Sequence, residues 1–131
     1  MVSCAVRASG KIMSLCATRN LSDAEGALTY RFGRPGRIEL TYPETVGLAK
    51  NLFRGGLLRT KGDFVQFSRG DVTYSVEYAD GPRVDHYAGV RVFRRGKQVA
   101  NLQCRLKGAL GPEGFGPIHR ANLPRGDYGF D

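Results

Sequence analysis

The chain offers few residues whose type and spacing could support catalysis. His86 directly follows Asp85, which could form half of an acid–base pair, but neither a serine in a strained turn nor a second carboxylate accompanies them. Gly111, Gly114 and Gly116 do not have the spacing of a phosphate-binding loop. We therefore predict a protein that is not an enzyme, with no catalytic residues and no cofactor.

The cysteines could form a disulfide but not a metal site. Cys4, Cys16 and Cys104 lack metal-ligand spacing, and the two histidines stand far apart in the sequence, so we expect no bound metal. Disulfides are common in small β proteins that are exported. Two pairings stay open: Cys16 with Cys104, which would join the first and last predicted strands, and Cys4 with Cys16 through a short loop.

Positive charge is the clearest chemical signal. The 131 residues include 20 lysines and arginines, 15 of them arginine, against 12 acidic residues, which gives a formal net charge of +8. These cations stand singly or in pairs at predicted turns, which favours a broadly basic surface over an arm dedicated to nucleic acid. Arginine is also enriched at protein–protein hot spots. The cations that we expect to contact an acidic protein partner are Arg34, Arg37, Arg59, Lys61, Arg69, Arg94, Arg95 and Lys97.

The alternative is a small β protein that binds nucleic acid by stacking bases on aromatic rings. The competing interpretation is that the rings fill the core, and with 10% aromatic residues and no tryptophan few are left for an exposed platform. The residues that would take part are Tyr30, Phe64, Phe67, Tyr74, Tyr78 and Phe93, with Arg31, Arg91 and Arg94.

Short strands must position these side chains. The most regular stretch runs from Asp63 to Gly81, where apolar residues between Val72 and Tyr78 alternate with polar ones such as Ser75 and Glu77. This period of two predicts a strand with one buried and one solvent-exposed face. With the preceding run and a turn at Gly70, which is free to take positive φ, it predicts a β-hairpin.

The rest of the chain repeats this pattern. Hairpins are expected over 28–42 and 88–106, a leading strand over 11–17, a brief strand near 57–60, and at most one short helix within 45–53. Together these predict an all-β domain over 1–107, a single antiparallel barrel or strongly curved sheet of about seven or eight strands. Residues 108–131 are rich in glycine and proline and predict an irregular tail, packed on the barrel or partly disordered.

Three stretches resemble a known group of proteins. LTYRFGRPGRIELTYP at 28–43, YSVEY at 74–78 and GVRVFRRGKQVANLQC at 89–104 resemble small exported barrels of Gram-negative bacteria. The group includes periplasmic inhibitors of C-type lysozyme and immunity proteins that neutralise secreted cell-wall effectors. The resemblance implies a non-enzymatic periplasmic or secreted inhibitor with a Cys16–Cys104 disulfide. Residues 1–4 also resemble the end of a lipobox, which would make Cys4 a lipid anchor, and we expect no signal peptide within the given residues, because no basic segment followed by an apolar core stands at their start.

The sequence departs from the lysozyme inhibitors in two ways. Residues 68–74, SRGDVTY, do not match the SGxxY loop that those inhibitors insert into the enzyme. In addition, a protein of net charge +8 would be repelled by a basic lysozyme. We therefore expect an acidic target, which fits a secreted effector and its immunity protein better.

Overall fold

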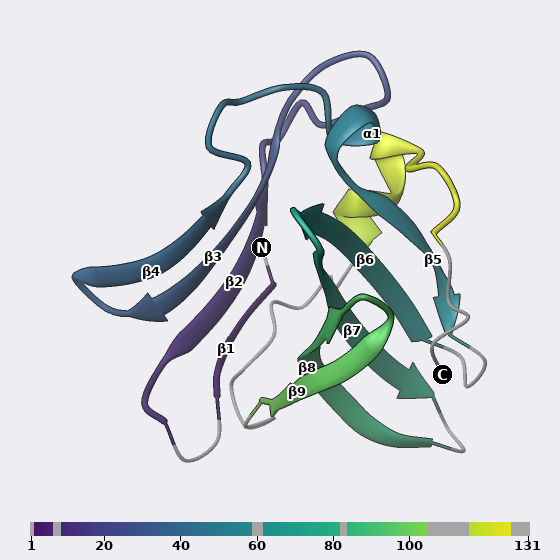
Figure 1. Cartoon of the computed structure of the whole chain (residues 1–131). Helices are drawn as coiled ribbons and strands as arrows, with labels where there is room; N and C mark the ends of the chain where they lie inside the picture. The colour runs from purple at the N-terminus through teal and green to yellow at the C-terminus, as the bar shows by residue number, and fades with distance from the viewer. Residues whose placement is uncertain (1, 7–8, 59–61, 82–83, 105–115, 127–131) are drawn as a thin grey trace.

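The computed structural model describes residues 2–6, 9–58, 62–81, 84–104 and 116–126 (Figure 1). These residues form two antiparallel sheets and two short helices. The four-stranded sheet has the order β1-β2-β3-β4 and the five-stranded sheet the order β5-β6-β7-β8-β9. The strands are β1 (Val2–Ala5), β2 (Ile12–Ala17), β3 (Leu28–Arg34), β4 (Arg37–Tyr42), β5 (Arg54–Leu58), β6 (Gly62–Arg69), β7 (Val72–Gly81), β8 (Val84–Arg94) and β9 (Lys97–Gln103), and the helices are α1 (Ala49–Leu52) and the 3₁₀ helix η1 (Gly116–Ala121).

The all-β class and the antiparallel hairpins are confirmed. Strands β3 and β4, β6 and β7, and β8 and β9 pair as the alternation predicts. Gly70 has φ of 62° at the β6–β7 turn, a left-handed conformation that glycine adopts without steric cost. The helix predicted within 45–53 is the single turn α1.

The prediction of one closed or strongly curved sheet is wrong, because the strands divide into two sheets. On one side, an isolated antiparallel bridge between Val6 and Cys104 links the sheets. On the other side, β4 ends at Tyr42 and Pro43 follows, which has no N–H with which to extend the ladder. The chain then passes through α1 into β5, so β4 and β5 do not pair.

The core lies between the inner faces of the two sheets. Its centre is a group of aromatic rings around Phe67, contributed by both sheets and by the α1 connection. The ring centroid of Phe67 lies 4.3 Å from that of Tyr42 and 4.9 Å from that of Tyr74, and both rings are stacked on it. Tyr30 and Phe53 approach the same ring at tilted and edge-on angles, at 5.1 and 5.7 Å. Phe67 therefore joins the two sheets.

The prediction of a solvent-exposed outer face on β7 is wrong, because Ser75 and Glu77 are buried. Glu77 pairs with Arg91 of β8 at 2.8 Å and accepts a hydrogen bond of 3.0 Å from the Ser75 hydroxyl. Phe64 also lies on this face, and a Cβ atom at Gly126 would come within 2.8 Å of its ring. Gly126 thus packs against this face at Phe64, and an ion pair stabilises the face at Glu77, so residue polarity does not reveal its burial.

Candidate functional site

Two neighbouring turns of the five-stranded sheet bring basic residues together. Because β7 pairs with β8, Val72 lies opposite Arg94, and the β6–β7 turn therefore lies beside the β8–β9 turn. The Arg95 backbone N–H donates a hydrogen bond of 3.1 Å to the Asp71 carbonyl oxygen. The Arg95 Nε atom also lies 3.3 Å from Asp71 Oδ2. We call the exposed surface formed by Arg69, Asp71, Arg94, Arg95 and Lys97 the basic end.

Within the basic end, two of the four cations have carboxylate partners. Arg69 pairs with Glu44 at 3.0 Å, and Arg95 pairs with Asp71. Arg94 and Lys97 lie opposite one another in the β8–β9 register, and neither contacts a carboxylate among the described residues. The arrangement therefore presents two like charges side by side, which a negatively charged surface would stabilise.

The remaining predicted contact residues do not join this surface. Arg34 and Arg37 face one another at the tip of the β3–β4 hairpin. Figure 1 shows this tip at the far left of the molecule, well separated from the end of β6. Arg59 and Lys61 lie outside the described residues. Of the eight predicted cations, the structure thus gathers Arg69, Arg94, Arg95 and Lys97 and places one other pair elsewhere.

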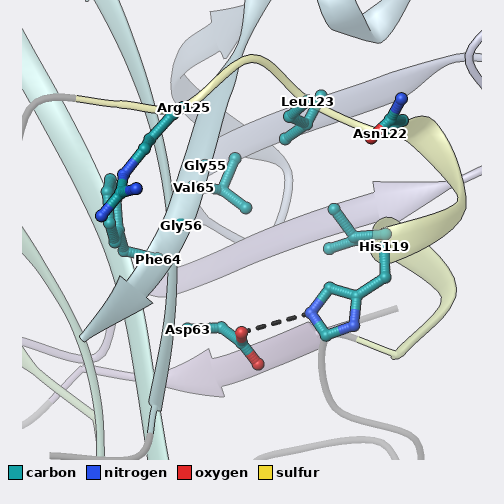
Figure 2. Close-up of a pocket in the computed structure, with 10 residues that line it drawn as sticks. Gly55, Gly56, Asp63, Phe64, Val65, His119, Asn122, Leu123 and Arg125 are labelled. Atoms are coloured by element: carbon teal, nitrogen blue, oxygen red, sulfur yellow. Dashed lines mark ion pairs between the residues drawn. The ribbon is translucent and has the colours of Figure 1, made fainter. Parts of the chain in front are cut away.

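A pocket lies near the opposite end of β6, between the five-stranded sheet and η1 (Figure 2). Its volume is about 430 Å³. The segment after η1 closes one side by running parallel to β5: the Gly55 N–H donates to the Pro124 carbonyl at 3.0 Å, and the Gly126 N–H donates to the Gly55 carbonyl at 2.9 Å. The lining residues are Gly55, Gly56, Asp63, Phe64, Val65, Ile118, His119, Asn122, Leu123 and Arg125.

A histidine–aspartate pair lies at this pocket. His119 Nε2 of η1 lies 3.2 Å from Asp63 Oδ1 at the start of β6 (Figure 2). Asp63 is 23% exposed and His119 is 62% exposed, so the pair is open to solvent. A carboxylate can orient an imidazole for proton transfer, and among the described lining residues there is no serine, threonine or cysteine that such a base would activate.

Nothing in the sequence pattern predicts that Asp63 and His119 lie together. Asp63 begins the predicted hairpin stretch and His119 belongs to the predicted irregular tail, and no local motif relates them. The pair singled out instead, Asp85 and His86, has side chains outside the described part of the structure. Among the described residues no group of three or more His, Cys, Asp or Glu side chains could hold a metal ion.

The aromatic residues do not form an exposed stacking surface. Four of the six rings proposed for nucleic acid, those of Tyr30, Phe64, Phe67 and Phe93, are buried. Tyr74 and Tyr78 are half-buried and pack against the core cluster. Base stacking requires an accessible ring face, so these positions do not supply the platform that the alternative needs.

The cysteines differ from the predicted pairing. Cys16 is a free thiol, so it forms neither of the two bridges considered for it. Cys104 is buried and disulfide-bonded. The side chain of Cys4, for which a lipid anchor is predicted, lies outside the described part of the structure. The backbone explains why Cys16 and Cys104 do not pair. Cys104 forms a β-bridge with Val6, next to the Ala5–Ile12 pair, whereas Cys16 lies four residues beyond Ile12 along β2. That separation is about 13 Å of strand, too far for a disulfide.

No described helix is long and apolar enough to cross a membrane. Comparison with family models, with curated proteins and with solved structures finds no match to this chain.

Proposed function

We propose that this is a non-enzymatic binding protein that inhibits or neutralises an acidic protein partner, and that the basic end makes the contact. The observation that carries the proposal is the adjacency of the β6–β7 and β8–β9 turns, which places four cations on one exposed surface. Separated cations would each contribute little to binding, whereas adjacent ones add their fields and accelerate the encounter with an acidic surface.

The turns hold these cations in place before binding. Strands β6, β7, β8 and β9 pair in antiparallel order up to both turns, with a register shift between Val92 and Phe93, and the Arg95–Asp71 hydrogen bond connects one turn to the other. A backbone that is already ordered loses less conformational entropy on binding than a mobile loop does. Arg94 and Lys97 are then free to form new ion pairs, while the contacts of Arg69 and Arg95 can be exchanged for contacts to the partner.

The proposed setting is periplasmic or extracellular, and the proposed target is an acidic effector that acts on the cell wall. The resemblance to exported inhibitors and immunity proteins supports this setting. A disulfide at Cys104 supports it as well, because disulfides persist mainly in oxidising compartments. The positive net charge supports an acidic target over a basic one.

The test is a binding measurement with the product of the neighbouring reading frame, since an immunity protein is normally encoded beside its toxin. We expect Arg94→Glu/Lys97→Glu to weaken the complex at least about tenfold, with most of the loss at low salt. The control is Arg34→Glu/Arg37→Glu, which makes the same charge change on the other sheet. Equal losses for both variants would show that net charge, and not the basic end, controls binding, and would refute the proposed contact surface.

A second binding measurement uses a single-stranded DNA oligonucleotide. The proposal predicts weak binding that disappears at physiological salt, because stacking rings are buried and only charge remains. Binding that persists at about 0.15 M salt and is lost in the Arg94→Glu/Lys97→Glu variant would replace the proposed function with nucleic-acid binding.

A further inference from the structure

We propose that the pocket between β5, β6 and η1 binds a small amphiphilic carboxylate, an organic acid with a short aliphatic or aromatic body. The feature that carries this inference is the combination of an apolar wall, formed by Val65, Ile118 and Leu123, with the cationic side chain of Arg125. Figure 2 shows Arg125 on one side of the pocket and His119 on the other, with Gly55, Gly56 and Val65 between them.

Two consecutive glycines of β5 let neighbouring side chains pack directly against the strand backbone at the pocket. Gly55 and Gly56 both line the pocket. A Cβ atom on Gly55 would lie 3.3 Å from Leu123 Cδ1, and one on Gly56 would lie 2.9 Å from the Phe64 ring. The volume of about 430 Å³ is within the range of small-molecule sites. The two glycines therefore bring Leu123 and Phe64 close to β5, where both side chains line the pocket.

The charges favour an anionic head group. Asp63 already has a partner, because His119 lies 3.2 Å from its Oδ1 atom. Arg125 is exposed and contacts no carboxylate among the described residues. A guanidinium binds a carboxylate through two parallel hydrogen bonds, which a single arginine can supply. Asn122, which also lines the pocket, adds an amide that can donate to the same ligand.

Several features favour a carboxylate over a free phosphate ion. Among the described residues that line the pocket, Arg125 is the only lysine or arginine, whereas phosphate sites commonly combine several cations or backbone N–H groups. The wall formed by Val65, Ile118 and Leu123 would remain hydrated beside an inorganic ion but would be covered by an organic body.

This site is separate from the basic end. Asp63 and Arg69 lie near the two ends of β6, about 20 Å apart along the strand. A ligand in the pocket therefore does not touch Arg94 or Lys97, and the inference stands or falls independently of the proposed partner.

The experiment titrates the full chain with three probes that share one body: 4-phenylbutyrate, its neutral amide and 4-phenylbutylamine. Backbone amide shifts in NMR spectra report the site. We expect saturable binding of the carboxylate with shifts at Gly55, Gly56 and Val65, weaker binding of the amide, and the weakest binding of the amine. Equal binding of all three probes, or no saturable shifts at these residues, would overturn the proposal.

Variants identify the side chains that select the carboxylate. Arg125→Gln should weaken 4-phenylbutyrate at least about tenfold and leave the amide unchanged, because only the carboxylate uses the charge. Arg54→Gln is the matched control, since it removes the same charge from an exposed position of β5 that does not line the pocket. Leu123→Ala should weaken all three probes to a similar extent.

Asp63→Asn gives a second readout that does not depend on removing Arg125. It deletes the negative charge of the pocket and preserves the shape of the side chain, so it should strengthen binding of 4-phenylbutyrate and weaken binding of 4-phenylbutylamine. Weaker carboxylate binding in Asp63→Asn, or equal losses in Arg125→Gln and Arg54→Gln, would show that Arg125 does not select the ligand.

Discussion

Replacing Phe67 by alanine tests the way the two sheets are joined. Phe67 is 3% exposed and stacks between Tyr42 of one sheet and Tyr74 of the other. Alanine at this position removes a whole ring from the centre of the aromatic group and leaves a cavity that the surrounding strands cannot close without shifting. We expect Phe67→Ala to lower the free energy of unfolding strongly and Phe67→Leu to lower it less.

Two effects determine how much Phe67→Ala lowers the free energy of unfolding: the lost burial of the ring and the cavity that remains. Removal of a buried phenylalanine ring costs about 3–5 kcal/mol through lost transfer energy and the remaining cavity. That loss already includes the aromatic contacts, of which each well-placed pair contributes about 0.5–1.5 kcal/mol beyond area burial. Leucine restores much of the volume but none of the stacking, so the loss for Phe67→Leu should be about 1–2 kcal/mol. A domain with about 5–15 kcal/mol of total stability would therefore survive the leucine variant far better than the alanine variant.

Urea unfolding monitored by circular dichroism measures both variants. The control is Val46→Ala, at a side chain that is 73% exposed and outside the sheets, which should change stability by less than about 0.5 kcal/mol. A loss below about 1 kcal/mol for Phe67→Ala, with an unchanged slope against urea, would refute the central position of Phe67 between the sheets.

Two further predictions concern ionisation and thiol chemistry. Burial, together with the nearby Tyr74, raises the pKa of Tyr30 above its ordinary value, so the folded state favours the protonated phenol. The stability from this preference is complete below about pH 10 and falls above it by up to about 1.4 kcal/mol per pH unit, so Tyr30→Phe should unfold at a higher pH in an alkaline titration monitored by circular dichroism; an identical midpoint would contradict it. Thiol labelling without reductant should modify Cys16 and leave Cys104 unmodified, and peptide mapping that finds Cys104 labelled in native protein would contradict the disulfide.

The strands were predictable because local patterns encode them. Alternation between Val72 and Tyr78 and the glycine at position 70 determine a strand and a turn from nearest neighbours alone. The division into two sheets was not predictable in this way, because it depends on which distant edges pair. Pro43 marked the end of β4, but whether the chain would then pair with β5 or turn away is a property of the tertiary structure.

Burial on the outer face illustrates a second limit. Glu77 and Ser75 are polar, and a period of two assigns them to solvent. Glu77 is nevertheless 3% exposed, because Arg91 and Ser75 satisfy its carboxylate. A buried charge is tolerated when it is paired and hydrogen-bonded, and that pairing joins residues on different strands. Polarity alone therefore misplaces a residue whenever the partner lies far away in sequence.

The sequence predicts the two candidate sites to different degrees. The turn arginines Arg69 and Arg95 could be identified from turn chemistry, and only their adjacency required the pairing of β7 with β8. Asp63 and His119 required knowledge that η1 folds back over the start of β6, which no local pattern in a glycine-rich segment conveys. Sites built from hairpin turns are thus easier to predict than sites formed where a C-terminal segment packs against a sheet.

The positions of the two sites on one strand make their functions separable. Phe67 lies in β6 between Asp63 at the pocket and Arg69 at the basic end. A variant that unfolds the core therefore abolishes partner binding and carboxylate binding together. Loss of both does not show which residues are responsible for either one. Arg94→Glu/Lys97→Glu and Arg125→Gln, by contrast, alter side chains on the surface, and sites more than about 10 Å apart with no shared partner contribute additively. Loss of one activity with the other intact is thus the pattern that distinguishes two independent sites from one unstable fold.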